Sequence, residues 1–205
     1  GLVNVEAPHP TQEGFQAAWL ERVSELLELP GDPRRHAAVI FLQNLPWFYH
    51  WDRPFAEARL LSLLRGDAAD VEAFWSGFFW SPRGLSAGLM QHLKPYLLAL
   101  SDRAWTKHRH IQRLSAHLLA AWHSRTETGE RMLNDAEMHL ALAKGSDEFR
   151  ANILSHLDRW SVEDQDAWRL DRMAMMNDVW PRQRSAKSPR VSAELVDLVL
   201  NSGEA

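Results

Sequence analysis

The spacing of hydrophobic residues is helical along almost the whole chain. Phe15, Trp19, Val23 and Leu27 recur every four residues, which places them on one face of a helix. Comparable stripes follow, and many of them end at a proline, a glycine or a polar residue suited to capping. No convincing alternation of apolar and polar residues appears. The pattern predicts an all-α protein with about nine or ten helices.

Residues that break or cap helices indicate where these helices begin and end. Pro46 and Pro95 are expected to kink or interrupt their helices, because proline lacks the backbone N–H that a helix needs. The polar stretch 124–130 is the clearest predicted loop. Ser161, followed by Asp164, is expected to cap one helix, and Ser192 to cap the last one.

Short connections predict that neighbouring helices form antiparallel pairs. The predicted pairs join 33–48 with 54–65, 67–80 with 83–100, 102–124 with 134–144, and 146–160 with 162–180. Each pair has the size of a HEAT-like repeat unit. Because no residue pattern repeats between the pairs, the chain fits either a HEAT-like solenoid or an irregular helical bundle.

The buried faces of the last two helices follow from the same spacing. The predicted inward residues are Trp168, Met173, Met176 and Trp180 in one helix, and Leu195, Leu198 and Val199 in the other. A basic, proline-containing stretch separates them. We therefore expect a helical domain at 1–181, a basic linker or loop at 182–191, and a terminal helix at 192–205 that begins a continuing helical region. Both ends of the chain resemble cuts from a larger protein.

Composition narrows the functional classes. The net charge of -4 excludes a globally basic nucleic-acid footprint. The lack of cysteine excludes disulfides, zinc–thiolate sites and cysteine nucleophiles, and it suits a reducing compartment. The sequence contains no apolar run long enough to span a bilayer and no basic-then-apolar leader. We expect a cytoplasmic protein without a membrane partner.

Recognisable catalytic motifs are missing. The ten histidines include no H-E-x-x-H pair, and the sequence has no G-x-S-x-G elbow or phosphate-binding glycine loop. The acidic residues Asp67, Asp70, Glu163, Asp166 and Asp171 lie near predicted helix starts, where capping and solvation explain them. We predict no catalytic, cofactor-binding or metal-ligating residue and no cofactor. A metal-dependent helical enzyme remains an alternative, with its ligands gathered from several helices.

Two basic segments are the best candidates for a contact surface. Basic side chains can neutralise phosphates, and indole rings can stack on bases. The candidate contact residues for nucleic acid or another partner are Arg103, Trp105, Lys107, Arg109, Arg113, Arg182, Arg184, Lys187 and Arg190. The alternative is that both segments are simply solvated, which the overall acidity favours.

Aromatic residues are concentrated in the segment FWSGFFWSP at 74–82. Five aromatic rings in seven positions cannot share one side of a helix. Central burial is the favoured explanation, and one edge exposed for a partner is the alternative.

The same segment, together with NDVWP at 177–181 leading through KSP at 187–189 to SGE at 202–204, resembles a known kind of protein region. It is similar to the helical C-terminal region of large bacterial proteins that carry a SIR2-like domain near the N-terminus, some of which act in anti-phage defence. The resemblance implies an accessory region that senses a trigger or mediates assembly, while the NAD-consuming domain lies elsewhere. It carries no catalytic residue onto this chain.

Taken together, these features predict a non-catalytic helical interaction, scaffolding or sensor module. Its expected partner is another protein or another domain of the same larger protein. A helical module that contacts nucleic acid is the second hypothesis.

Overall fold

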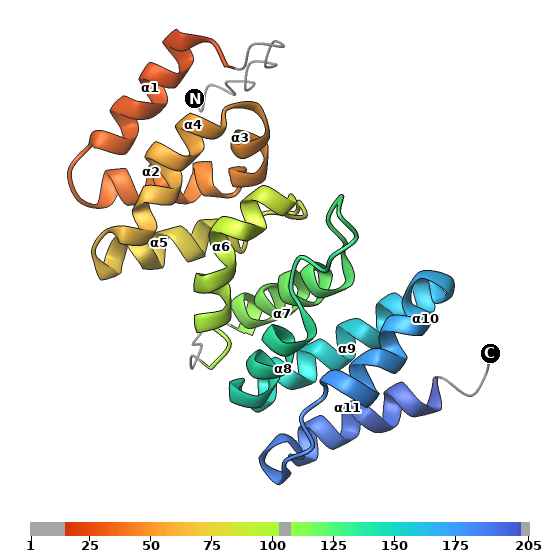
Figure 1. Cartoon of the computed structure of the whole chain (residues 1–205). Helices are drawn as coiled ribbons and strands as arrows, with labels where there is room; N and C mark the ends of the chain where they lie inside the picture. Colours follow the sequence, from red (N-terminus) through yellow and green to blue (C-terminus); the bar gives the residue numbers. More distant parts are fainter. Residues whose placement is uncertain (1–14, 103–107, 202–205) are drawn as a thin grey trace. The chain divides into compact units, whose positions relative to one another are not determined.

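The computed structural model describes residues 15–102 and 108–201. Within these ranges the chain forms eleven α-helices, short 3-10 and π segments, and no strand, which confirms the predicted all-α class (Figure 1). The chain divides into two compact units, Gly1–Arg83 and Gly84–Ala205. The predicted 1–181 domain therefore spans both units.

Helices of unit 1 begin where the sequence supplies a cap or a proline. Pro33 and Pro46 lie in the first turns of α2 and α3, and the Asp67 carboxylate accepts a hydrogen bond from the Asp70 backbone N–H at 2.8 Å to cap α5. The elements of this unit are α1 (Ala17–Glu28), α2 (Asp32–Leu42), α3 (Leu45–Trp51), α4 (Arg53–Phe55), η1 (Ala56–Leu60), η2 (Leu61–Arg65) and α5 (Ala68–Phe78). Pro46 therefore begins a helix, whereas the sequence predicted that it would kink or end one.

The core of unit 1 is centred on the packing of α2 against α5. At this crossing Gly77 comes so close to α2 that a Cβ built on it would lie 2.6 Å from the Val39 carbonyl oxygen. The aromatic run of α5 is buried here, as predicted: Phe74, Trp75, Phe78 and Phe79 are all buried, whereas Trp80 is half exposed.

A charged network next to this core corrects one interpretation of the sequence. Asp70 was expected to be solvated at a helix start, but it is 5% exposed. Arg34 Nη2 donates to its carboxylate at 2.5 Å, and Arg35 Nε lies 3.4 Å from it. Because a buried carboxylate needs such partners, Asp70 holds the start of α2 against the start of α5.

Unit 2 contains the remaining helices. They are α6 (Ala87–Ala99), α7 (His108–His123), α8 (Asp135–Lys144), α9 (Asp147–Glu163), α10 (Gln165–Ala174), η3 (Met175–Val179), η4 (Arg184–Ala186) and α11 (Pro189–Leu200). The long helix α9 packs against α7, α10 and α11, and the ribbon shows α10 and α11 beside it (Figure 1). The predicted pairing of 146–160 with 162–180 is the α9–α10 contact.

Local chemistry explains the boundaries of α8 and α9. Asn134 and Glu137 form a reciprocal capping box at the start of α8. At the start of α9, the buried guanidinium of Arg150 donates to the Leu142 and Gly145 carbonyl oxygens at 3.0 and 2.5 Å and to the Asp147 carboxylate at 2.5 Å. It thereby bonds one carbonyl near the end of α8 and the carbonyl of the residue after it, and joins the two helices.

Three predicted boundaries in unit 2 are wrong. Helix α6 continues through Pro95. Ser161 is buried inside α9 and donates to the Asp158 carbonyl oxygen, so the cap of α10 is Asp164, which accepts from the Ala167 backbone N–H. The last helix begins at Pro189, capped by Ser188, because proline suits the first turn.

None of the described helices combines the length and the apolar character that a membrane crossing demands.

Candidate functional site

The first predicted basic segment lies only partly in the described structure. Arg103, Trp105 and Lys107 fall outside the described residues, and so does the side chain of Arg109. Arg113 is half-buried on α7. Burial lowers the pKa of His117 to about 4, and the nearby charge of Arg113 lowers it as well.

Arg113 also acts on a histidine of α9. His156 Nε2 donates to the Gln112 carbonyl oxygen at 3.0 Å, and Arg159 Nη2 donates to the other ring nitrogen at 3.0 Å. Burial lowers the pKa of His156, and the charges of Arg159 and Arg113 lower it further. His117 and His156 are therefore both neutral near pH 7.

The second basic segment is exposed. Arg182, Arg184, Lys187 and Arg190 are all open to solvent. Arg182 Nη2 donates to the Asn177 carbonyl oxygen at 2.9 Å. Among the described residues, no hydrogen bond or ion pair joins this segment to Arg113. The two segments do not form one described basic site.

A buried ion cluster, which the sequence did not predict, connects α10 to the loop that follows α7. Asp171 is 7% exposed. Arg131 Nη2 donates to one of its carboxylate oxygens at 2.5 Å, and His123 Nδ1 donates to the other at 2.7 Å. Burial alone would raise the pKa of Asp171, but the hydrogen bonds from Arg131 and His123 outweigh it and hold the pKa below its usual value. The interpretation of Asp171 as a solvated residue was wrong.

Aromatic rings hold both partners of Asp171 in place. The Arg131 guanidinium lies 4.0 Å from the centroid of the Trp122 ring and donates to the Trp122 carbonyl oxygen at 2.6 Å. The His123 ring stacks on Trp168 with centroids 3.9 Å apart. Trp122 Nε1 donates in turn to Asp135 at 2.7 Å. The predicted 124–130 loop is present, and an isolated bridge between Arg125 and Arg131 closes it.

A histidine paired with a buried carboxylate can serve as a general base when a reacting group lies within reach. The hollow beside this pair, about 560 Å³, is lined by His123, Ser124, Arg125, Met132, Ala167, Leu170 and Asp171. Each side chain of the cluster has a structural partner, so the cluster is explained by holding the loop on α10. In the described part of the chain, no three histidine or acidic side chains are placed to hold a metal ion.

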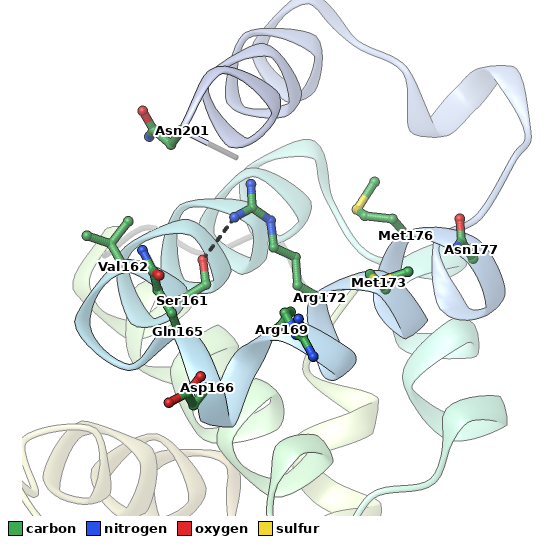
Figure 2. A pocket seen from close by; sticks show the side chains of 10 residues that line it. All are labelled: Ser161, Val162, Gln165, Asp166, Arg169, Arg172, Met173, Met176, Asn177 and Asn201. Carbon is green, nitrogen blue, oxygen red and sulfur yellow. Dashed lines mark hydrogen bonds between the residues drawn. The ribbon is translucent and has the colours of Figure 1, made fainter. Parts of the chain in front are cut away.

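A second hollow lies on the other flank of α10, and we call it the α10–α11 groove. It measures about 580 Å³, within the range of ligand and peptide sites. Figure 2 shows its lining, which comes from the end of α9, from α10 with η3, and from the residue that follows α11: Ser161, Val162, Gln165, Asp166, Arg169, Arg172, Met173, Met176, Asn177 and Asn201.

Arg172 crosses the floor of this groove. Its guanidinium donates to Ser161 Oγ at 3.4 Å and to the Leu198 carbonyl oxygen, so it connects α10 with both α9 and α11. Arg169, one turn earlier, is exposed at the rim. The groove therefore combines a fixed cation, an exposed cation and apolar side chains.

The side chains that project outward from α10 form a continuous ridge. Asp166, Arg169, Leu170 and Met173 follow the spacing of one helix face and are all exposed; we call them the α10 ridge. Leu170 is 70% exposed. Trp168 and Asp171 point the other way and are buried. The prediction that Met173 faces the core was therefore wrong.

Helix α11 presents a comparable apolar surface, which we call the α11 face. Val196, Val199 and Leu200 are each more than half exposed, whereas Leu198 is buried against α9. The prediction for Leu198 is confirmed, and the one for Val199 is wrong. The spacing of apolar residues in the sequence does not say which face of a helix is buried. Only the packing on α9 shows which of these residues remain exposed.

Comparisons with known proteins identify no relative of this chain. No protein-family model, no curated protein and no solved structure matches the chain. The resemblance to helical regions of SIR2-like proteins therefore stays a prediction from the sequence.

Proposed function

We propose that this chain is a non-catalytic protein-interaction module that binds its partners through the α10 ridge and the α11 face. One observation carries the proposal. Large apolar side chains that are more than half exposed gather at the C-terminal end of unit 2: Val162, Leu170, Met173, Val196, Val199 and Leu200. These side chains lie on α9, α10 and α11, and α10 and α11 both pack on α9. Exposed apolar surface is typical of interaction sites when it forms a large patch.

The geometry suits a helical partner. Helices α10 and α11 both pack on α9, and the α10–α11 groove lies beside them. Amphipathic helices commonly bind by laying an apolar face into such a groove. Met173 and Val162 supply apolar contacts at the groove, while Arg169 supplies a charge that selects the orientation of the partner.

From the sequence resemblance alone, we further propose that such a module belongs to a larger bacterial protein with a SIR2-like domain. The bound partner is then another domain or another chain of the same assembly. The His123–Asp171 cluster serves to hold α10, and so the ridge, in position.

Site-specific photocrosslinking tests the function. A photoreactive amino acid at position 170 or 199 in cells is expected to trap a discrete protein, which mass spectrometry identifies. The control is position 155, an exposed serine on α9. The adduct at 199 must disappear when Val196 on the same face is replaced by glutamate. Failure of both positions to give any adduct above the control would exclude the proposed surfaces.

A further inference from the structure

The α10 ridge carries an acid and a base without ion-pair partners. Asp166 and Arg169 are three residues apart on α10, and both are exposed. Neither makes an ion pair with another residue in the described parts of the chain. Opposite charges at this spacing are able to pair along a helix, but here both remain available to a partner.

The order of side chains along this surface is complementary to its own reverse. On its groove side it reads apolar, acidic, basic, apolar, through Val162 at the end of α9 and then Asp166, Arg169 and Met173 of α10, all of which line the α10–α11 groove. Read backwards, the charges exchange places. An antiparallel second copy would therefore set each acid opposite a base and each outer apolar residue opposite the other.

We infer that the α10 ridge binds the α10 ridge of a second copy of this chain, antiparallel and across a two-fold axis. The inference rests on the proposed interaction function and names its partner. In this arrangement Asp166 of each copy faces Arg169 of the other, and Val162 faces Met173. A two-fold interface requires that a surface complement itself in this way.

The shape of this surface agrees with the charge pattern. The α10 ridge stands between two hollows of about 580 and 560 Å³. Leu170 lines one of them and Met173 the other. Two antiparallel ridges fit beside each other when each enters the hollow of its neighbour.

Apolar contact and charge have different roles in this pair. Burial of Leu170 and Met173 supplies most of the affinity, because exposed ion pairs contribute only about 0–1 kcal/mol each. The two Asp166–Arg169 pairs instead set the register and exclude parallel pairing. A small interface of this type gives a dimer with a dissociation constant on the order of micromolar.

Sedimentation velocity on the full chain tests the inference, at concentrations up to about 100 µM. The wild type is expected to sediment as a dimer. Asp166→Arg and Arg169→Asp each place like charges opposite one another and should each weaken dimerisation at least about tenfold. The control is Arg184→Asp, a charge reversal at an exposed position outside α10, which should leave the dimer intact.

Mixing the two single variants distinguishes the loss of a contact between the copies from the loss of the fold. In a mixed pair, the arginine introduced at position 166 of one copy faces the aspartate introduced at position 169 of the other, and the second contact is the native Arg169–Asp166 pair. An equimolar mixture should therefore form a heterodimer although each variant alone is monomeric. The double variant Asp166→Arg/Arg169→Asp should dimerise as the wild type does. A monomeric wild type, or a mixture that stays monomeric, would overturn the inference.

The outcome also separates this inference from the proposed function. A monomeric chain that still forms a crosslink from position 170 to a different protein would retain the interaction function and assign the ridge to a foreign partner. If the chain dimerises but position 199 forms no crosslink to other proteins, the α10 ridge stands as an interaction surface and the α11 face does not.

Discussion

The imidazole of His123 lies flat on the indole of Trp168, with ring centroids 3.9 Å apart and planes 13° from parallel. His123 ends α7, and Trp168 lies in the middle of α10, so the stack joins two helices that are distant in sequence. It also fixes the imidazole so that Nδ1 meets the Asp171 carboxylate at 2.7 Å. The orientation of α10, and hence of its ridge, depends on this contact.

Replacing Asp171 with asparagine should reduce stability by about 3–5 kcal/mol near pH 7, because the substitution leaves the Arg131 guanidinium, only 14% exposed, without its carboxylate. Urea unfolding at pH 7 measures the loss. The control is Asp178→Asn, an exchange at an exposed residue that should change stability by less than about 0.5 kcal/mol.

The pH dependence provides a second check on Asp171. Its pKa is lowered in the folded chain, so its contribution is complete above the ordinary carboxyl pKa of about 3.9 and is lost as the pH falls through the lower folded value. The difference between wild type and variant should therefore narrow below about pH 4. A difference that is the same at pH 3 and pH 7 would contradict an electrostatic role.

Gly77→Ala should destabilise unit 1, although alanine favours helices by about 1 kcal/mol over glycine. The added Cβ would lie 2.6 Å from the Val39 carbonyl oxygen and 2.7 Å from Leu42 Cβ, so α2 and α5 must move apart. We expect a net loss of about 1–3 kcal/mol, measured by thermal or urea unfolding. Gly84→Ala is the matched control, because nothing lies within 4 Å of its added Cβ; a Gly77 variant no less stable than this control would show that the helices are not in close contact.

The helical class and many caps were readable from the sequence because they are local. Asn134 and Ser146 cap α8 and α9, and a side chain that bonds its own next turn needs no tertiary information. Burial was less predictable. Asp70 and Asp171 resemble ordinary first-turn or surface acids, and only the folded chain brings arginines to them from 36 and 40 residues away.

The exposed side chains of the candidate surface were also not predictable from the sequence. Met173 and Val199 were assigned to the core because their spacing is helical, and both are exposed. Periodicity groups residues on a face, but a helix with apolar residues on two sides leaves the inner face undecided. The pairing of α10 and α11 with α9 decides it, and that pairing is tertiary.

Pro95→Ala should stabilise unit 2. Pro95 is exposed and lies inside α6, where it lacks the N–H that would bond the preceding turn. Because the helix already continues through this position, alanine can restore the hydrogen bond without a change of path. We expect a gain of about 1–3 kcal/mol in the free energy of unfolding, whereas Gln91→Ala, at an exposed position one turn earlier, should change it little. A loss of stability in the Pro95 variant would mean that the proline shapes α6 in a way that its neighbours require.

His117 should make the folded chain sensitive to mild acid. Burial, and then the charge of Arg113, lower its pKa to about 4 in the folded state, whereas an unfolded histidine titrates near 6.5. Between these values the unfolded chain binds more protons, so this contribution to stability is complete above about pH 6.5 and is lost as the pH falls toward 4. The stability lost between about pH 6.5 and pH 4 through His117 amounts to about 3 kcal/mol. His156, whose pKa is also lowered, adds to this loss.

His117→Gln removes the titrating group and should flatten the stability profile between about pH 6.5 and pH 4. Urea midpoints collected across this range measure the slope for wild type and variant. His36→Gln is the control, because His36 is exposed and its side chain is hydrated in both states. If the two variants have equal slopes, the acid sensitivity does not come from His117. If only the His117 variant has a shallower slope than the wild type, the neutral imidazole of His117 is the form that the folded chain requires.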